Sequence, residues 1–481
     1  MHESSVQPRW PAPLAIQHTT PHHSPTMHLV HILIIALAFI SEASAQIPRM
    51  TEVFQVNVQP FADSKSTCVR NINGRPLFEP NAAAFSGSSG ILNIIWDQLH
   101  MIYQNANDAV STQGYNNPGH YRTRQLLFSF FGIQPREQPD FHTEAAFEYS
   151  SEEAEVKPRT FYRKLQNVRW NFKDAWKIIN RRQPDGENKI KLMCDGTFMV
   201  FQTAQDEVKD ANGDPIPKGP HDTGEGNWKL GEWELSKGRK FEAQWYFWYE
   251  IAGEKGYIVL DRAGYPAIPG TNPPAPWSND PRTNKPNPCI GGQHGNLGST
   301  IIGMPKHCWE GGGSDFSDCG GSEFGDGGED SPPPDDDQSA PWSEGSWIIL
   351  CEASFSKGLL QPPPHAPPDG ASLDSLDLTS NTLSHEVYHL TERENDDADK
   401  RLLIPGMTDL TIKSEFNILH GRPTNGATEC MFLARWEVAG PFTESYAAVS
   451  TKNPESYAWA AAAFWLQAIW DRDFSSGACE Q

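Results

Sequence analysis

The pentapeptide His385-Glu386-Val387-Tyr388-His389 constrains this chain more than any other feature of its sequence. Capping residues occupy positions 379–381 before it, and Leu383, Val387 and Leu390 follow one another at i, i+4 and i+7. This spacing predicts a helix with one apolar stripe. On that helix the two histidines lie one turn apart on the same face, so their side chains are neighbours.

Two imidazoles in this arrangement can bind one zinc ion, each at about 2.0–2.1 Å from the metal. Glu386 lies one step round the helix, where its carboxylate can reach a zinc-bound water and accept the proton of that water. The alternative is a surface helix with two solvated histidines. The motif on an amphipathic helix favours the metal site, so we expect His385 and His389 to be zinc ligands and Glu386 to be a catalytic base.

The residues after the motif restrict the class of zinc protein. A metzincin would have a glycine three residues and a histidine six residues after the second motif histidine. Here Glu392 and Asn395 stand at those positions, which excludes that class. A third protein ligand therefore has to come from farther along the chain.

Residues 27–45 have the features of a secretory signal peptide. An apolar run over 29–40 precedes Ala43-Ser44-Ala45, which predicts cleavage after Ala45 and a leader over 1–45. The alternative is an N-terminal membrane anchor, but the run is short for a bilayer span. All eight cysteines follow position 45, and an even number in an oxidising compartment suggests up to four disulfides.

Periodicity divides the rest of the chain into helical and extended parts. We expect amphipathic helices over 91–109 and 161–179, with polar, irregular chain over 113–157 between them. Residues 263–345 are rich in Gly, Pro and Asp, and we expect them to form a disordered insertion. Their Asp-rich stretch lacks the spacing of a calcium loop. Apolar runs indicate strands, and these lie over 190–194, 198–201, 241–249, 256–260 and 347–351.

Composition restricts the possible partners. The net charge of −22 repels phosphate and anionic lipid unless a local basic patch forms, and the densest basic run is only Asn180-Arg181-Arg182. We therefore expect neither nucleic-acid binding nor a membrane anchor after cleavage of the signal. The 16 Trp and 12 Tyr leave a carbohydrate-binding module as an alternative, although their places within apolar runs favour use in a core.

Four segments resemble the aspzincins, which are secreted fungal zinc metallopeptidases of the deuterolysin and lysine-specific metallo-endopeptidase type. The resemblance extends over residues 348–465. It is carried by a strand that ends in cysteine (348–355), the zinc helix (383–391), a helix that contains Cys430 (426–434) and a last helix that begins after Asn453 (453–458). The resemblance implies an α+β, zincin-like fold with a C-terminal helical part, bound zinc and hydrolysis of peptide bonds.

The resemblance also implies an aspartate as the third zinc ligand, within a segment Gly-Thr-x-Asp-x-x-Tyr-Gly. The nearest match is Asp409, which follows Pro405-Gly406 and Thr408, although Ile412 stands where the family has tyrosine and Asn425-Gly426 replaces the later Tyr-Gly. The alternative role for Asp409 is to cap a helix that starts at Leu410. Other residues could provide the third ligand instead, and these are Glu415, His420, Asp396, Asp397 and Asp399.

Together these observations predict one zincin-like domain over residues 46–481 that is secreted and monomeric and acts on protein or peptide substrates. The departure from the aspartate and tyrosine pattern leaves one further possibility. That alternative is a secreted zinc-binding relative without peptidase activity, serving as an interaction protein or effector.

Overall fold

The chain divides into two compact units, Met1–Ile47 and Pro48–Gln481. Only residue 47 of the first unit is described, so the predicted signal peptide over 27–45 lies outside the described residues. The computed structural model describes residues 47–58, 68–111, 121–133, 156–182, 189–220, 222, 224–238, 240–251, 254–261, 279–280, 284–287, 289, 297–301, 346–391, 426–435 and 450–480.

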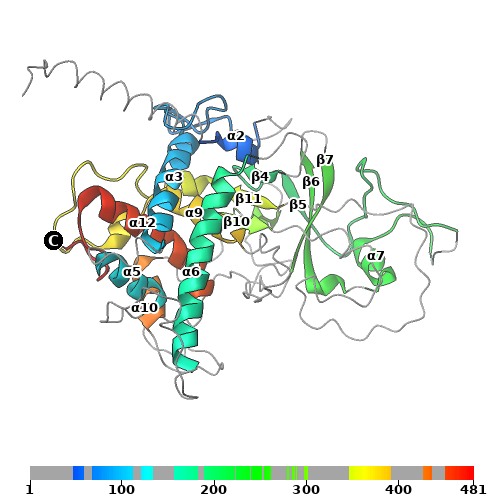
Figure 1. Ribbon diagram of the computed structural model, residues 1–481. Helices are drawn as coiled ribbons and strands as arrows, with labels where there is room; N and C mark the ends of the chain where they lie inside the picture. Colours follow the sequence, from blue (N-terminus) through cyan, green and yellow to red (C-terminus); the bar gives the residue numbers. More distant parts are fainter. Residues whose placement is uncertain are drawn as a thin grey trace, which may run out of the picture. The chain divides into compact units, whose positions relative to one another are not determined.

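A four-stranded mixed sheet lies at the centre of the second unit (Figure 1). Its strands, in spatial order, are β1 (Phe54–Val56), β4 (Ile190–Met193), β11 (Trp347–Leu350) and β10 (Gly298–Ile301). The first three run parallel, whereas β10 pairs antiparallel to β11, with Thr300 opposite Ile348. Every residue of β11 is buried, as expected for a strand covered on both faces.

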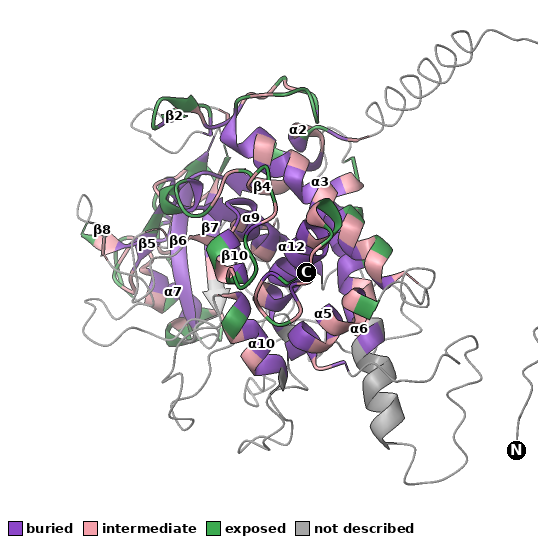
Figure 2. Cartoon of the chain, turned by 90° about the vertical axis from the view of Figure 1, so that its left-hand side faces the viewer, coloured by how far each residue is buried: buried purple, intermediate pink, exposed green. Residues whose placement is uncertain are grey.

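Helices cover one side of this sheet. They are α2 (Met50–Val53), α3 (Ile91–Val110), α5 (Tyr121–Phe131), α6 (Val156–Asn180), α9 (Ser380–Tyr388), α10 (Ala427–Arg435) and α12 (Pro454–Trp470). Helix α12 packs against α3, α5 and α9, and its residues from Ser456 to Leu466 are all buried (Figure 2). The helices expected over 91–109 and 161–179 are confirmed as α3 and α6. The mixture of helices and strands confirms the α+β class.

A second, antiparallel sheet packs beside the first. It consists of β5 (Met199–Gln202), β6 (Gln244–Ile251) and β7 (Glu254–Asp261), and helix α7 (Leu230–Ser236) lies nearby. Its contact with the central sheet is aromatic, because Trp347 of β11 stacks on Phe198 at 5.5 Å and meets Tyr249 edge-on at 4.9 Å. The tryptophans and tyrosines of this region are therefore used in core packing, as the apolar runs predicted.

Two sequence expectations need correction. The region over 113–157 is not irregular throughout, because it contains α5 and the start of α6. Helix α5 forms because it buries four apolar side chains, those of Leu126, Leu127, Phe130 and Phe131. The segment over 263–345 contains β8 (Asn279–Asp280), β9 (Lys285–Pro286) and β10, so part of it is ordered. Strand β10 forms there because β11 offers a pairing edge.

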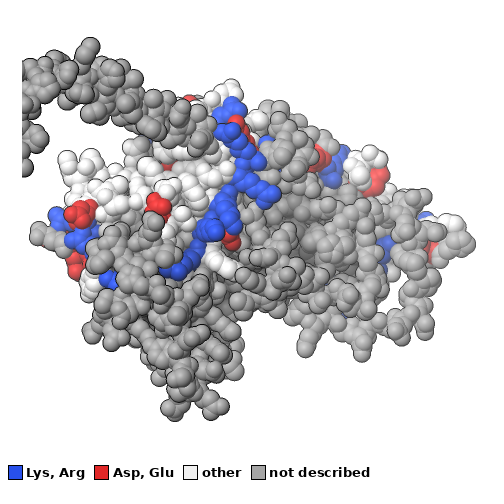
Figure 3. All heavy atoms as spheres, viewed as in Figure 1, with Lys and Arg blue, Asp and Glu red and all other residues white. Residues whose placement is uncertain are grey.

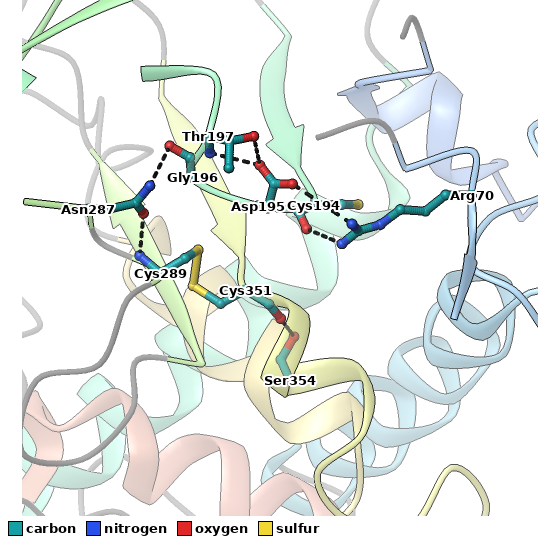
Figure 4. Close-up of a disulfide and its surroundings, with 9 residues drawn as sticks. All are labelled: Arg70, Cys194, Asp195, Gly196, Thr197, Asn287, Cys289, Cys351 and Ser354. Atoms are coloured by element: carbon teal, nitrogen blue, oxygen red, sulfur yellow. Dashed lines mark hydrogen bonds and ion pairs between the residues drawn. A yellow bond between two sulfur atoms is a disulfide. The ribbon is translucent and has the colours of Figure 1, made fainter. Parts of the chain in front are cut away.

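Two disulfides close the carboxyl ends of neighbouring strands. Cys194 directly follows β4 and pairs with Cys68. Cys351 directly follows β11 and pairs with Cys289 (Figure 4). Cys430 and Cys479 are also buried and belong to neither of these two disulfides. The other two cysteines, at 308 and 319, lie outside the described residues.

Polar contacts hold the same edge of the sheet. Arg70 donates from Nη2 to the carbonyl oxygen of Cys194 at 3.2 Å (Figure 4). Its Nη1 atom lies 3.5 Å from a carboxylate oxygen of Glu352. Asn287 donates to the carbonyl of Gly196 at 3.2 Å and accepts from the backbone N–H of Cys289 at 2.8 Å. This edge is therefore fixed covalently and by hydrogen bonds. Within the described residues no helix is both long and apolar enough to cross a membrane.

Candidate metal centre

The predicted motif helix is confirmed as α9. The three residues of its apolar stripe, Leu383, Val387 and Leu390, are at most 5% exposed, so this side of the helix is in the core. His389 stands at the C-cap position. Both motif histidines remain half-buried on the opposite side, where an ion could reach their rings.

The two histidine rings converge. The Nε2 atoms of His385 and His389 lie 3.1 Å apart, and their ring centroids are separated by 4.9 Å. Two nitrogens bound to one tetrahedral zinc ion, each at about 2.0–2.1 Å, are about 3.3 Å apart. The pair therefore has nearly the separation that a shared zinc ion requires, without a change of rotamer.

Glu455 fixes the orientation of the first histidine. It lies in the first turn of α12, and its Oε2 atom is 2.6 Å from Nδ1 of His385. Its other oxygen accepts a hydrogen bond from Nε1 of Trp459 at 2.9 Å. An ionised carboxylate only accepts hydrogen bonds, so Nδ1 of His385 carries the proton and Nε2 presents a lone pair. This carboxylate–histidine pair is the usual support of a histidine that binds zinc.

The side chain of Glu386 lies against β10. Its side chain is only 4% exposed. The Thr300 hydroxyl lies 2.7 Å from its Oε2 atom and 2.9 Å from its carbonyl oxygen, so the hydroxyl donates to this residue. A Cβ atom added at Gly298 would lie 2.5 Å from Oε1. Strand β10 therefore needs glycine here, because its backbone passes directly beside the carboxylate.

Three tyrosines lie behind the motif helix and belong to the core. Tyr388 contacts the rings of Tyr103 and Tyr457 at 5.4 and 5.2 Å. The Tyr103 hydroxyl donates to the carbonyl of Ser384 at 3.2 Å, and that of Tyr457 donates to the carbonyl of Thr451 at 2.9 Å. Burial raises the pKa of all three phenols, so they stay neutral. None of these three hydroxyls is exposed to serve as an oxyanion donor.

The predicted third ligand lies outside the described residues. Asp409 is outside the described residues, as are all the competing acidic residues and His420. Within the described part of the chain, no three His, Cys, Asp or Glu side chains come together as a metal site. The donor set observed is thus two imidazole nitrogens with the correct spacing, one of them oriented by a carboxylate. This set fits zinc but leaves the third ligand a prediction.

Sequence reasoning placed His385, Glu386 and His389 on one helix but missed the residues that contact their side chains. The sequence around Glu455 predicts only the start of the last helix and its packing in the core. The available signal was an acidic residue in the first turn of a helix that is otherwise apolar. Thr300 and Gly298 fall inside the segment predicted to be insertion, where no local pattern indicates their role.

Comparison of the chain with protein-family models, with curated proteins and with solved structures found no match. The resemblance to the aspzincins therefore rests on the sequence segments named above.

Proposed function

We propose that this chain is a zincin-type, zinc-dependent endopeptidase of the aspzincin kind. In this proposal His385 and His389 bind zinc, Asp409 is the third ligand and Glu386 is the general base. The observation that carries the proposal is the pair of Nε2 atoms 3.1 Å apart, together with the Glu455 carboxylate 2.6 Å from Nδ1 of His385.

A zinc ion at this position would supply Lewis acidity for the attack of water on a peptide carbonyl. The contribution of the protein is to orient the reacting groups. Glu386 would accept the proton of the attacking water, and the Thr300 hydroxyl keeps its carboxylate in one rotamer. Burial of this carboxylate against Gly298 limits its contact with bulk water.

We also propose that the protein is secreted, that it acts as a monomer and that its substrates are proteins or peptides. The two disulfides Cys68–Cys194 and Cys289–Cys351 support this location, because structural disulfides persist in oxidising compartments. The predicted signal peptide over 27–45 supports it independently.

The test is the substitution Glu386→Gln in secreted protein. The amide has the same shape but cannot accept the proton, so turnover of casein should fall by about 10²–10⁴ while zinc content stays unchanged. Glu225→Gln makes the same chemical change at an exposed position and should leave both quantities unaltered. Hydrolysis by Glu386→Gln within a few-fold of the parent would show that this residue is not the base.

One observation favours a second candidate, a zinc-binding protein without peptidase activity. Glu386 is 4% exposed and is hydrogen-bonded to Thr300, which is also the arrangement expected of a carboxylate that only joins a helix to a strand. This second candidate predicts bound zinc but no hydrolysis of casein by the parent. In that case Glu386→Gln would lower the stability of the fold and would have no activity to abolish.

A further inference from the structure

Two Asn-Gly steps in the described part of the chain lie in tight turns, and their surroundings differ. Asn73-Gly74 joins β2 (Asn71–Ile72) to β3 (Arg75–Pro76), and Asn212-Gly213 lies in a loop before α7. In such a step the backbone nitrogen of the glycine can attack the side-chain carbonyl carbon of the asparagine. Glycine favours this attack because it has no Cβ atom to crowd its nitrogen.

The first step forms the turn of a short hairpin at the surface. Ile72 pairs with Arg75, and the two residues between them, Asn73 and Gly74, have φ angles of 52° and 79°. Positive φ at both central positions defines the type I′ turn that favours Asn-Gly. Both residues are exposed, and Figure 2 shows β2 at the surface of the molecule.

The reacting groups of this first step are open to attack. Within the described residues, neither the Gly74 N–H nor the side chain of Asn73 has a hydrogen-bond partner. A Cβ atom built on Gly74 would meet no atom within 4 Å, so the ring that forms in the attack has room. The flanking strands have two residues each, and such a small hairpin gives little resistance to rotation of the peptide.

In the second step, Asp210 engages the same two groups. The Gly213 N–H donates to the carbonyl oxygen of Asp210 at 2.9 Å, and Nδ2 of Asn212 donates to Oδ2 of Asp210 at 3.3 Å. The carbonyl oxygen of Asn212 accepts from Nζ of Lys255 at 2.8 Å. Attack at Asn212 therefore requires hydrogen bonds to break first, whereas attack at Asn73 does not.

We propose that Asn73-Gly74 is a site of self-modification, at which asparagine is converted to aspartate and isoaspartate. The Gly74 nitrogen loses its proton to solvent and bonds to Cγ of Asn73, and the side-chain nitrogen leaves as ammonia. Water then opens the resulting succinimide ring at one of its two carbonyl carbons. Cleavage of the bond to Cγ gives aspartate, and cleavage of the bond to the backbone carbonyl carbon gives isoaspartate. Water is the only co-reactant, and the reaction does not depend on the zinc site.

The isoaspartyl product would loosen the contact of Arg70 with the edge of the central sheet. Its backbone contains one extra methylene group, which a two-residue type I′ turn cannot accommodate without loss of strand register. The hairpin helps to hold Arg70, because the Leu77 N–H donates to the Arg70 carbonyl oxygen at 2.6 Å. The guanidinium of Arg70 donates in turn to the carbonyl of Cys194 at 3.2 Å. A change at the exposed turn is thus transmitted to the end of β4.

The experiment incubates the full secreted chain at mildly alkaline pH and follows both Asn-Gly peptides by mass spectrometry, with isoaspartate identified by electron-transfer fragmentation. Asn73 should convert at least about tenfold faster than Asn212, because each hydrogen bond that has to break slows the reaction by about threefold to tenfold. Asp210→Ala removes the carboxylate that holds the side chain of Asn212. This variant should speed conversion at Asn212 and leave the rate at Asn73 unchanged.

Asn73→Gly is the matched unreactive variant, because glycine also adopts positive φ and has no side-chain amide. After incubation, the melting temperature should fall further in the parent than in Asn73→Gly. Three results would overturn the proposal. They are an unmodified Asn73, conversion of Asn212 as fast as that of Asn73, and an equal fall in melting temperature in the parent and in Asn73→Gly.

Discussion

Acid should destabilise this protein through His100, a histidine enclosed in the core. Its side chain is 2% exposed and lies edge-on to the rings of Trp96 and Trp176, with centroids at 4.8 and 6.0 Å. Neither ring nitrogen has a hydrogen-bond partner within the described residues. Burial therefore disfavours the charged imidazolium and lowers the pKa of His100 from 6.5 to about 4.

The direction of the effect follows from proton linkage. Because the pKa is lower in the folded state, the unfolded chain binds this proton first as the pH falls. The stability that His100 contributes is present above pH 6.5 and is lost progressively down to about pH 4. Each pKa unit is worth about 1.4 kcal/mol, so the free energy of unfolding should fall by about 3 kcal/mol across this window and by about 2 kcal/mol at pH 5.

The substitution His100→Phe removes the titrating group and keeps a ring of similar shape. Guanidinium unfolding of parent and variant at several pH values from 7 to 4 gives the difference in unfolding free energy. The motif histidines are present in both proteins, so their titration cancels. The variant should gain on the parent by about 3 kcal/mol as the pH falls to 4, whereas His365→Phe, at an exposed position, should change nothing. Parallel pH profiles for parent and His100→Phe would refute this role of the buried histidine.

Three further substitutions test the support of the candidate site. Glu455→Gln should weaken zinc binding by about 10–100-fold, measured against a competing chelator, because Nδ1 of His385 loses its carboxylate; an unchanged affinity would remove Glu455 from the site. Thr300→Val should lower the free energy of unfolding, measured in urea, by about 2 kcal/mol, because Glu386 loses a hydrogen bond. Thr300→Ser keeps the hydroxyl and should retain most of that stability. Equal losses in both variants would contradict a role for the hydroxyl. Asp374→Ala should lower the free energy of unfolding by about 1 kcal/mol in the same assay, because Asp374 accepts from the first backbone N–H of α10 at 2.6 Å. Asp374→Asn keeps an acceptor and should lower it less. Equal losses in the two variants would argue against capping.

Local pattern predicted the parts of the fold whose cause is local. The motif helix and the helix of residues 91–109 show apolar side chains at helical spacing, and both form where this spacing places them. Asn453 occupies the N-cap of α12 with Pro454 at its first turn, as expected. The side chain of Asn453 does not cap the helix, however. Its amide donates to the Ser456 hydroxyl at 3.0 Å instead of accepting from a backbone N–H of the helix.

The remaining features arise from contacts between distant segments, which a single sequence does not encode locally. Thr300 reaches Glu386 across 86 positions of the chain, and Glu455 reaches His385 across 70. The glycine and polar residues of strand β10 indicate a loop when they are considered without their partners. The structure provides a reason for that composition, since Gly298 leaves room for the carboxylate of Glu386.

The spacing of the basic residues in α6 is a related case, and Figure 3 shows basic side chains in a band across one face of the molecule. A search for contiguous basic residues misses a helix that places them every fourth position, as α6 does with Arg169, Lys173 and Lys177. The helix itself is correctly predicted by its apolar spacing. Grouping the charges by helical face would therefore have located this row of basic residues from the amino-acid sequence alone.

Elemental analysis of the secreted protein tests most directly whether His385 and His389 form a zinc site. The comparison is between the parent and the double variant His385→Ala/His389→Ala, each purified without added metal. We expect about one zinc ion per chain in the parent, removable by chelators, and almost none in a variant that keeps its fold. Equal zinc in the two proteins, or a parent that holds none even after incubation with zinc, would contradict the assignment of this site.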